Sequence, residues 1–488
     1  MNSTEPGVLT TCPAGTLSGI DRGSTKVFKG IRFAEVQRLG DPVDVEGWAG
    51  ELDATAFQPQ APQNSGSLER MIGGSSLPTA EDCLYLNVYT PSCDGAQRPV
   101  LFWVHGGAFL TGGGAMPWYD GSRLAARGDV VVVTINYRLG ALGYLGSRNG
   151  GTLDQVSALR WVARNIGAFG GDPGNVTLFG ESAGGSAAIA LMATPAANDL
   201  FHRIWAMSPS LPQLRSARHG ERFEEAFLGA LGTTSLESVW TAPVSDLLAA
   251  QTVMESSADA GLKIFAPTEG TSSIPGPILD VASSDARPMV IGTTRDESAL
   301  FTAFDPSRAG WTDADVDREF AFRFNSHAPE SVESYRQHHP EASANQLVTA
   351  MQTDHVFRWP AWSLASERAS GPSEVSTWMY AFDFATPSFG GVLGSCHGLD
   401  IPFAFDNLHR PGAETFTGDG GDRQGVADQF SSAIIAFAHD DDPGWNRYDT
   451  SDRATQRIGP EPEVVSDPDP GLRDLWERRA GSRGDESS

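Results

Sequence analysis

A serine in a Gly-x-Ser-x-Gly pattern is the residue of this chain best suited to nucleophilic chemistry. Ser182 lies in Gly180–Gly184 (GESAG), directly after the apolar run Val176–Phe179 and before a run of small residues that predicts a helix. Small residues two positions before and after a serine allow a strained turn from strand to helix, which lifts the hydroxyl clear of the sheet. The amide of Ala183 would lie at the helix N-terminus, where the helix dipole favours negative charge. The pattern predicts that Ser182 is the nucleophile of an acyl transfer.

A second loop of small residues could stabilise the oxyanion of that reaction. His105–Phe109 (HGGAF) follows the apolar run Val100–Val104. Consecutive small residues let backbone NH groups point into a cavity, and the loss of one such donor commonly lowers turnover ~10²–10³-fold. Two glycines after a strand often form only a turn. The position of this loop, on the N-terminal side of the serine turn, favours the oxyanion interpretation.

A serine of this kind needs a general base, and the chain has 10 histidines. His397 lies late in the chain, in a glycine-flanked stretch that could present its ring to Ser182. His338, His339 and His439 have neighbours typical of surface residues. His397 is therefore the predicted base.

A carboxylate between the serine and the histidine should orient the imidazole. Glu297 has the right place in the chain, shortly after the apolar run Pro288–Gly292. Its neighbour Asp296 is a rival, and Asp400 is a weaker one. The local sequence leaves this choice open.

The elements that must position these residues alternate between strand and helix. Apolar runs predict buried strands, and helical spacing of apolar residues predicts a helix over Asp154–Ile166; the strand-like runs are Val100–Val104, Asp129–Asn136, Val176–Phe179 and Pro288–Gly292. This alternation predicts an α/β fold with a large, doubly wound, mostly parallel sheet flanked by helices.

The rest of the chain fits one large domain covering residues 1–488. Two stretches, about 211–277 and 309–373, have helical spacing that interrupts the strand pattern, and we expect them to be helical insertions that roof the sheet. The polar tail, residues 478–488, is expected to be frayed.

Composition excludes several classes of partner. The 35 Lys and Arg against 61 Asp and Glu give a formal charge of -26, which opposes binding to nucleic acid or to an anionic membrane. The same charge favours a monomer or a weak homo-oligomer. The sequence has no apolar leader and no membrane-length apolar stretch, so a cytoplasmic location is expected. The 4 cysteines lack metal-ligand spacing, so we expect no metal site.

Together with these residues, motifs along nearly the whole chain make it resemble the type B carboxylesterases, the lineage that includes the cholinesterases. It looks most similar to bacterial carboxylesterases of the para-nitrobenzyl esterase type. Besides the serine turn and Cys396-His397, the motifs that carry the resemblance are Phe28–Ala34, Glu81–Val88, Tyr119–Gly121, Asn136–Gly140, Ala168–Pro173 and Arg295–Glu297.

The resemblance implies an α/β-hydrolase fold with an active-site gorge and a serine carboxylesterase that works through a covalent acyl-enzyme. It assigns the acid to Glu297 rather than Asp296, and no metal or organic cofactor is implied. The other implied site residues are the oxyanion donors Gly107, Ala108 and Ala183, with Glu181, Ser208 and Gly106 in supporting positions. The expected substrate is a small carboxylic ester. The alternatives are a non-catalytic adhesion or binding member of the fold, or the same chemistry on carbamates, amides or lipids.

Overall fold

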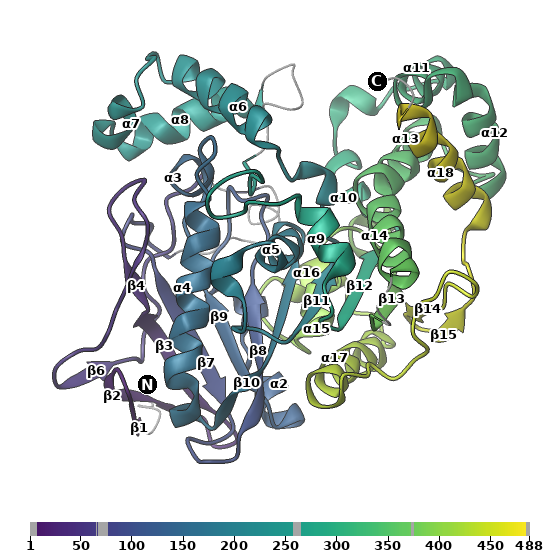
Figure 1. Cartoon of the computed structure of the whole chain (residues 1–488). Coiled ribbons are helices and arrows are strands. Elements are labelled where there is room, and N and C mark those ends of the chain that lie inside the picture. The colour runs from purple at the N-terminus through teal and green to yellow at the C-terminus, as the bar shows by residue number, and fades with distance from the viewer. Residues whose placement is uncertain (1–6, 65, 67–76, 257–264, 372–374, 485–488) are drawn as a thin grey trace.

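The computed structural model describes residues 7–64, 66, 77–256, 265–371 and 375–484. Within these residues a 13-stranded mixed sheet runs through the molecule in the order β1-β2-β3-β7-β9-β8-β10-β11-β12-β13-β14-β15, with β6 beside β2 (Figure 1). From β9 to β14 all neighbouring strands are parallel. The predicted mostly parallel α/β sheet is therefore confirmed.

The strands of this sheet include the four predicted apolar runs, with ends that differ by a few residues. Their bounds are β1 Gly7–Cys12, β2 Gly15–Asp21, β3 Lys26–Arg32, β6 Glu51–Asp53, β7 Tyr85–Thr90, β8 Arg98–Val104, β9 Val131–Ile135, β10 Gly171–Glu181, β11 Arg203–Met207, β12 Met289–Thr294, β13 Thr377–Phe382, β14 Thr455–Ile458 and β15 Glu463–Val465. Two short strands, β4 (Ala34–Glu35) and β5 (Val43–Asp44), pair separately.

The central strands read as continuous apolar runs because both faces of the sheet are covered. In β8, Val100 and Phe102 pack into one core cluster, whereas Leu101 and Trp103 pack into another on the opposite face. Burying each such side chain stabilises the fold by about 1.5–3 kcal/mol. Alternate residues of β8 therefore pack against helices on opposite faces of the sheet.

Helices form these two layers (Figure 1). The cluster that contains Val100 includes residues of α4 (Gly150–Asn165), α5 (Ala183–Met192), α9 (Ile278–Ser284) and α14 (Trp359–Ser370). The cluster that contains Trp103 includes residues of α2 (Ser122–Gly128), α15 (Ile401–Ala404), α16 (Ala413–Thr417) and α17 (Arg423–Asp440). The sheet is doubly wound, as predicted.

The predicted insertions are helical, but the second one extends less far than expected. Beyond the carboxyl ends of the strands lie α6 (Ala217–Ala230), α7 (Glu237–Thr241), α8 (Val244–Glu255), α11 (Asp313–Phe324), α12 (Ala328–His338) and α13 (Ala344–Thr353). The sequence also placed α14 in the roof, and this was wrong. Arg368 of α14 donates from Nε to Thr377 Oγ1 of β13 at 3.0 Å, and Ala361 and Leu364 are buried with the sheet. α14 is a layer helix because its apolar side matches the sheet.

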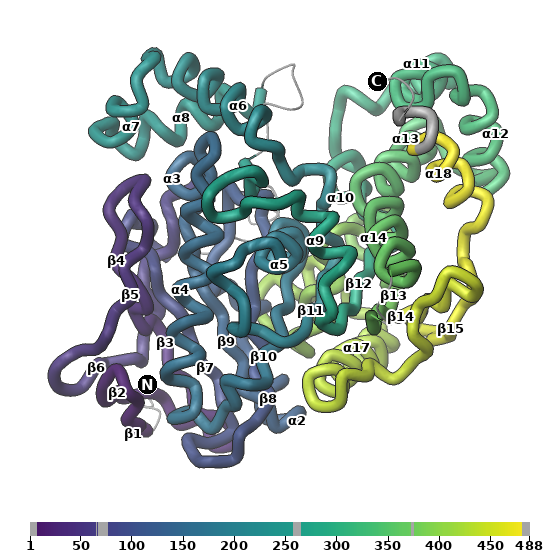
Figure 2. Tube along the Cα trace, in the orientation of Figure 1, coloured from purple at the N-terminus to yellow at the C-terminus, as the bar shows by residue number. Residues whose placement is uncertain are grey.

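The tail prediction was also wrong over part of its length. Instead of fraying from residue 478, the chain forms α18 (Pro470–Gly484), and residues 485–488 lie outside the described part. Trp476 is fully buried against α11 to α13, and Arg478 pairs with Glu330 at 2.8 Å. Tertiary packing of one apolar side thus holds a helix whose sequence looks polar. Figure 2 shows α18 and β1 at opposite ends of the molecule.

No helix of the described residues has the length and apolar character needed to cross a bilayer.

Candidate active site

Ser182 occupies a sharp turn between β10 and α5. Its backbone has φ 58° and ψ -120°, a conformation that costs a residue with a side chain of order 1–3 kcal/mol. Its amide donates to the carbonyl of Met207 on β11 at 2.9 Å, and its carbonyl accepts from Ser186 in α5. Ser182 itself is half-buried, whereas Glu181 and Ala183 are buried. The neighbouring elements therefore hold the strained turn in place.

The glycines of the serine turn are required by close packing. A Cβ atom on Gly184 would lie 1.9 Å from the carbonyl oxygen of Val104 in β8, and one on Gly180 would lie 2.6 Å from the backbone of Gly184. Both distances are far below a van der Waals contact. The glycines of the motif are therefore needed because α5 packs closely against β8, the strand before the predicted oxyanion loop.

The structure brings His397 and Glu297 together from the ends of two neighbouring strands. Glu297 follows β12, and His397 lies in the long connection after β13. His397 Nδ1 lies 2.6 Å from Glu297 Oε2, and the other carboxyl oxygen of Glu297 accepts from the amide of Thr294 at 2.8 Å. Glu297 is fully buried. Because a carboxylate only accepts, the bond requires a proton on Nδ1 and leaves Nε2 facing away from the acid.

The rival acids occupy different places. Asp296 accepts from the amide of Ser395 at 2.8 Å and pairs with Arg295, so it ties the acid loop to the histidine loop. Asp400 is fully buried, and neither carboxyl oxygen has a hydrogen-bond partner among the described residues. Neither carboxylate contacts the histidine ring as Glu297 does.

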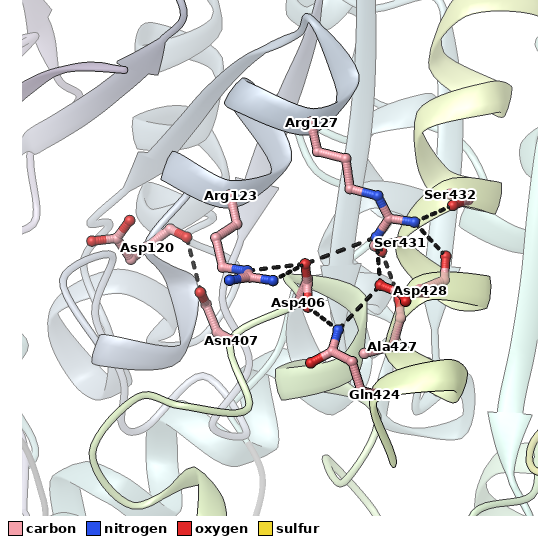
Figure 3. Close-up of polar contacts among 10 residues, drawn as sticks. All are labelled: Asp120, Arg123, Arg127, Asp406, Asn407, Gln424, Ala427, Asp428, Ser431 and Ser432. Atoms are coloured by element: carbon pink, nitrogen blue, oxygen red, sulfur yellow. Dashed lines mark hydrogen bonds and ion pairs between the residues drawn. The ribbon is translucent and has the colours of Figure 1, made fainter. Parts of the chain in front are cut away.

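A buried polar network anchors the chain just after His397 (Figure 3). Asp406, 3% exposed, pairs with Arg123 of α2 at 2.8 Å and accepts from Gln424 of α17 at 2.8 Å. Its neighbour Asn407 donates to the carbonyl of Asp120 at 2.9 Å. The segment that carries the histidine is thus fastened to two helices on the far face of the sheet.

The Nε2 nitrogen of His397, which Glu297 does not contact, faces Glu181, the residue directly before Ser182. Nε2 lies 3.1 Å from Glu181 Oε1. Among the described residues, the ring nitrogens of His397 contact Glu297 and Glu181, and no hydrogen bond joins the Ser182 hydroxyl to His397. Such bonds are often long or misaligned before substrate binds, so this geometry is compatible with a base that turns toward the serine later.

Three buried carboxyl groups, those of Glu181, Glu297 and Asp400, act electrostatically on His397. Burial lowers the pKa of His397, but the carboxylates of Glu181 and Glu297 outweigh burial and raise it to about 9. Burial raises the pKa of Glu181 to about 7 against the opposing effect of His397. Burial also raises the pKa of Asp400 well above its ordinary value, and Glu181 and Glu297 add to the rise. The carboxylates that face His397 therefore stabilise its imidazolium form.

The predicted oxyanion loop is bent by unusual backbone angles. Gly107 has φ 104°, and Ala108 and Phe109 have φ 55° and 58°, in the left-handed region that residues with a Cβ rarely adopt. A Cβ on Gly106 would lie 2.7 Å from Glu181 Oε2, so this glycine brings the loop against the serine turn. The loop and the turn form one packed unit.

His105 at the start of the loop has a structural setting. Burial lowers the pKa of His105 to about 4, and its ring stacks on Tyr137 with centroids 4.4 Å apart. Its Nδ1 donates to the Gly106 carbonyl at 2.8 Å, because that carbonyl can only accept. A neutral His105 therefore stiffens the loop.

Some residues near the site carried no signal in the sequence. Gln63 brackets the end of the oxyanion loop, since it accepts from the amide of Gly112 and donates to its carbonyl at 2.7 and 2.8 Å. The ring of Phe357 lies 4.7 Å from that of His397. Ser208, predicted from the resemblance, is buried directly after β11, and its hydroxyl has no hydrogen bond to any residue that the structure describes. Only spatial neighbourhood identifies Gln63 and Phe357.

A buried chain of polar groups supports the acid loop from the roof. Phe357 belongs to a π-helical turn, Asp354–Arg358, and Arg358 donates to the carbonyl of Arg295 at 2.5 Å. Asp354 accepts from Arg358 and from Tyr335 at 2.5 Å each. The Trp476 indole of α18 donates to Tyr335 at 2.9 Å. The C-terminal helix is thereby connected to the loop before Glu297.

A cavity of about 580 Å³ lies on the far side of the acid loop. Its lining includes Thr294, Asp296 and Arg358 but neither Ser182 nor His397. It is thus separate from the predicted nucleophile and base.

Comparison with known proteins shows the family of the chain. The model of the carboxylesterase family matches residues 4–469. The chain belongs to the carboxylesterase family. It is 35% identical over 478 residues to the phenmedipham hydrolase of Pseudarthrobacter oxydans, covering 93% of this chain and 95% of that protein. It is 34% identical to the para-nitrobenzyl esterase of Bacillus subtilis, covering 94% and 96%.

Solved carboxylesterases have the same fold. A carboxylesterase of Geobacillus stearothermophilus aligns with a TM-score of 0.85 at 33% identity, covering 96% of this chain and 99% of that one. A para-nitrobenzyl esterase structure aligns with a TM-score of 0.83, also at 33% identity. This carboxylesterase therefore has the α/β-hydrolase fold and hydrolyses carboxylic esters, as the resemblance implied.

Proposed function

We propose that this carboxylesterase works by covalent catalysis, with Ser182 as nucleophile, His397 as general base and Glu297 as the acid that orients the histidine. The observation that carries the proposal is the 2.6 Å contact between His397 Nδ1 and Glu297, beside a strained serine turn. In the neutral imidazole, this contact keeps the proton on Nδ1, so that Nε2 can accept a proton.

In the first step, Nε2 takes the hydroxyl proton while Ser182 attacks the ester carbonyl. A rotation of the His397 ring or of the serine side chain must bring these atoms together, since Nε2 lies beside Glu181 in the free protein. The imidazolium then donates the proton to the leaving alcohol. Water repeats the sequence on the acyl-enzyme and releases the acid.

The oxyanion of each tetrahedral intermediate is assigned to the amides of Gly107, Ala108 and Ala183. The positive φ of Gly107 and Ala108 turns the loop over the serine, and Ala183 is the first residue of α5. Amides at a helix N-terminus add the favourable end of its dipole. Glu181 is proposed to act on His397 across the 3.1 Å contact, and Gly106 to keep the loop against the serine turn, with Ser208 as a further supporting residue.

The substrate is proposed to be a small carboxylic ester. The names of the relatives cover several compounds, including a para-nitrobenzyl ester and phenmedipham, so they support the reaction class more strongly than any one substrate. A monomeric or weakly associated state and a cytoplasmic location stay predictions of the sequence.

The proposal is tested with Ser182→Ala and with a fluorophosphonate probe that labels activated serines. Wild type should hydrolyse para-nitrophenyl acetate and take up one equivalent of probe, whereas Ser182→Ala should lose both properties while its circular dichroism stays unchanged. A Ser182→Ala protein with wild-type turnover would refute the proposal. A wild type that neither turns over nor takes up the probe would favour a non-catalytic binding role.

A further inference from the structure

Two residues of one helical segment bond the backbone on both sides of Glu297. Arg358 donates from Nη2 to the carbonyl of Arg295, two residues before the acid, at 2.5 Å. The amide of Ser298, one residue after the acid, donates to Oγ1 of Thr353 at 3.0 Å. The two bonds span 63 and 55 residues of sequence. We call Thr353 and Arg358 the acid clamp.

The π-helical turn Asp354–Arg358 brings the two clamp residues toward the same side of the helix. Its closing hydrogen bond runs from the amide of Trp359 to the carbonyl of Asp354, five residues earlier. Residues five apart lie about 140° apart around an α-helix, because each residue turns it by about 100°. A turn closed over five residues reduces this angle, and such turns are frequently found at functional sites. The local backbone thus lets Thr353 and Arg358 reach the same loop.

Burial and charge fix the clamp itself. Thr353 is buried, and so is Asp354, which accepts from Nη1 of Arg358 at 2.5 Å. The guanidinium therefore uses one nitrogen for the Asp354 carboxylate and the other for the carbonyl of Arg295. Because a guanidinium is planar, its donors lose little freedom when each of them bonds. Arg358 is thus held in place before it bonds the acid loop.

Packing gives the acid loop little support on the side of the clamp. The cavity of about 580 Å³ lies there, and its lining includes Asp296 as well as Thr353 and Arg358. Groups that face a cavity lack the close contacts that fix side chains in a packed core. The two clamp bonds therefore supply support that packing does not give on this side of the loop.

The orientation of Glu297 depends on the neighbouring peptide groups that the clamp bonds. The carboxylate of Glu297 lies 2.6 Å from Nδ1 of His397, and its carbonyl accepts from the amide of His397 at 3.2 Å. A shift of Arg295 or Ser298 would move this carboxylate relative to the imidazole. A displacement near 1 Å at a catalytic group can lower kcat about 10²-fold.

We propose that Thr353 and Arg358 are positioning residues of this esterase, which hold Glu297 in the orientation that prepares His397 to act as base. This inference rests on the proposed roles of Glu297 and His397. The clamp bonds end on the residues that flank the acid, so their effect on the reaction passes through the acid. Loss of a clamp bond should therefore lower kcat rather than raise KM, and only while the charge of Glu297 is present.

Thr353→Val tests the clamp without a change of charge or of side-chain shape. It removes the acceptor of the Ser298 amide, so kcat for para-nitrophenyl acetate should fall on the order of 10-fold with KM kept within about twofold. Thr353→Ser keeps the acceptor and should keep kcat. Thr377→Val is the matched control, since Thr377 Oγ1 is also a buried acceptor, from Nε of Arg368, and lies at the first residue of β13. This control should keep both kcat and KM.

Two further proteins show whether the clamp acts through the acid. In a Glu297→Gln background, Thr353→Val should lower kcat by less than about threefold more, because the charge that it positions is already gone. Asp354→Asn combined with Arg358→Met removes the other clamp bond without leaving one buried charge unpaired. This double variant should also lower kcat with KM kept. Circular dichroism checks that each protein is folded.

The outcomes separate the clamp from the proposed catalysis. Equal losses of kcat from Thr353→Val with and without the Glu297 charge would overturn the proposal. It would also be overturned by an unchanged kcat in both Thr353→Val and the double variant, or by an equal loss in Thr377→Val. If Glu297→Gln alone keeps the wild-type kcat, the proposed role of the acid is wrong, and that result does not depend on the clamp.

Discussion

His397 Nε2 lies 3.1 Å from Oε1 of Glu181, the residue directly before Ser182. A carboxylate at this distance stabilises the imidazolium and raises the pKa of His397 to about 9, together with Glu297. Only neutral imidazole can accept the serine proton. We therefore predict that kcat/KM falls as pH drops from about 9 toward 6, with the acid limb above the ordinary histidine range. A pH profile with para-nitrophenyl acetate measures this limb, and a midpoint at or below 6.5 would contradict the prediction.

Removal of the Glu181 charge should move the acid limb of the kcat/KM profile to lower pH. Glu181→Gln keeps the size of the side chain but deletes the carboxylate closest to Nε2, so the pKa of His397 should fall and kcat/KM should persist to lower pH. Glu46→Gln, which changes an exposed carboxylate remote from the site, serves as control and should leave the limb in place. A shift of the limb to higher pH in Glu181→Gln would show that the electrostatic reasoning is wrong.

The charge of Glu297 should affect turnover more than binding. Glu297→Gln can keep the bond from the Thr294 amide, but it removes the charge that faces the imidazolium. We expect kcat to fall by about 10³–10⁴-fold with a small change in KM. Asp296→Asn tests the rival acid and should lower kcat less than tenfold. The assignment of the acid would be reversed if Asp296→Asn were the more damaging variant.

Close packing between the oxyanion loop and the serine turn gives a steric prediction. Gly106→Ala would place a Cβ 2.7 Å from Glu181 Oε2 and 2.8 Å from its carbonyl oxygen, so the loop must shift. A displacement near 1 Å can lower kcat up to about 10²-fold. Gly167→Ala adds the same methyl group where no atom lies within 4 Å, and it should retain activity. Steady-state kinetics of the Gly106→Ala and Gly167→Ala variants measure kcat for each, and equal values would contradict this packing.

The network of Figure 3 should contribute to stability. Asp406→Asn keeps a residue that tolerates the left-handed backbone at φ 54°, but it removes the charge that faces Arg123. We expect the free energy of unfolding to fall by about 1.5–3 kcal/mol, measured by urea denaturation. Asp428→Asn changes an exposed member of the network and should cost less than half as much. Equal costs would show that burial of Asp406 contributes nothing.

The serine turn could be predicted from sequence because its constraints are local. Gly184 approaches the Val104 carbonyl so closely that only glycine fits, and strand and helix patterns on either side give the context. Glu297 could not be separated from Asp296 by local sequence, because adjacent carboxylates at a strand end have the same pattern. Their difference is the direction of each side chain, which the packing against His397 and Ser395 decides.

Features that depend on distant segments were missed or misplaced. α14 has the same composition as the roof helices, and only the match of Leu364 to the sheet distinguishes it. The tail near Trp476 looked frayed because its partners lie more than a hundred residues earlier, as Tyr335 does.

Helix α18 is connected to the acid loop by a chain of hydrogen bonds, which runs from Trp476 through Tyr335, Asp354 and Arg358 to the carbonyl of Arg295. Strand β1 has no part in this chain, so α18 and β1 differ as places to attach other groups. Strand β1 lies at the opposite edge of the sheet, remote from the acid loop (Figure 2). An affinity tag or a surface linker is therefore better attached ahead of β1. Tethering through α18 would transmit any pull or strain directly to the loop that carries the acid.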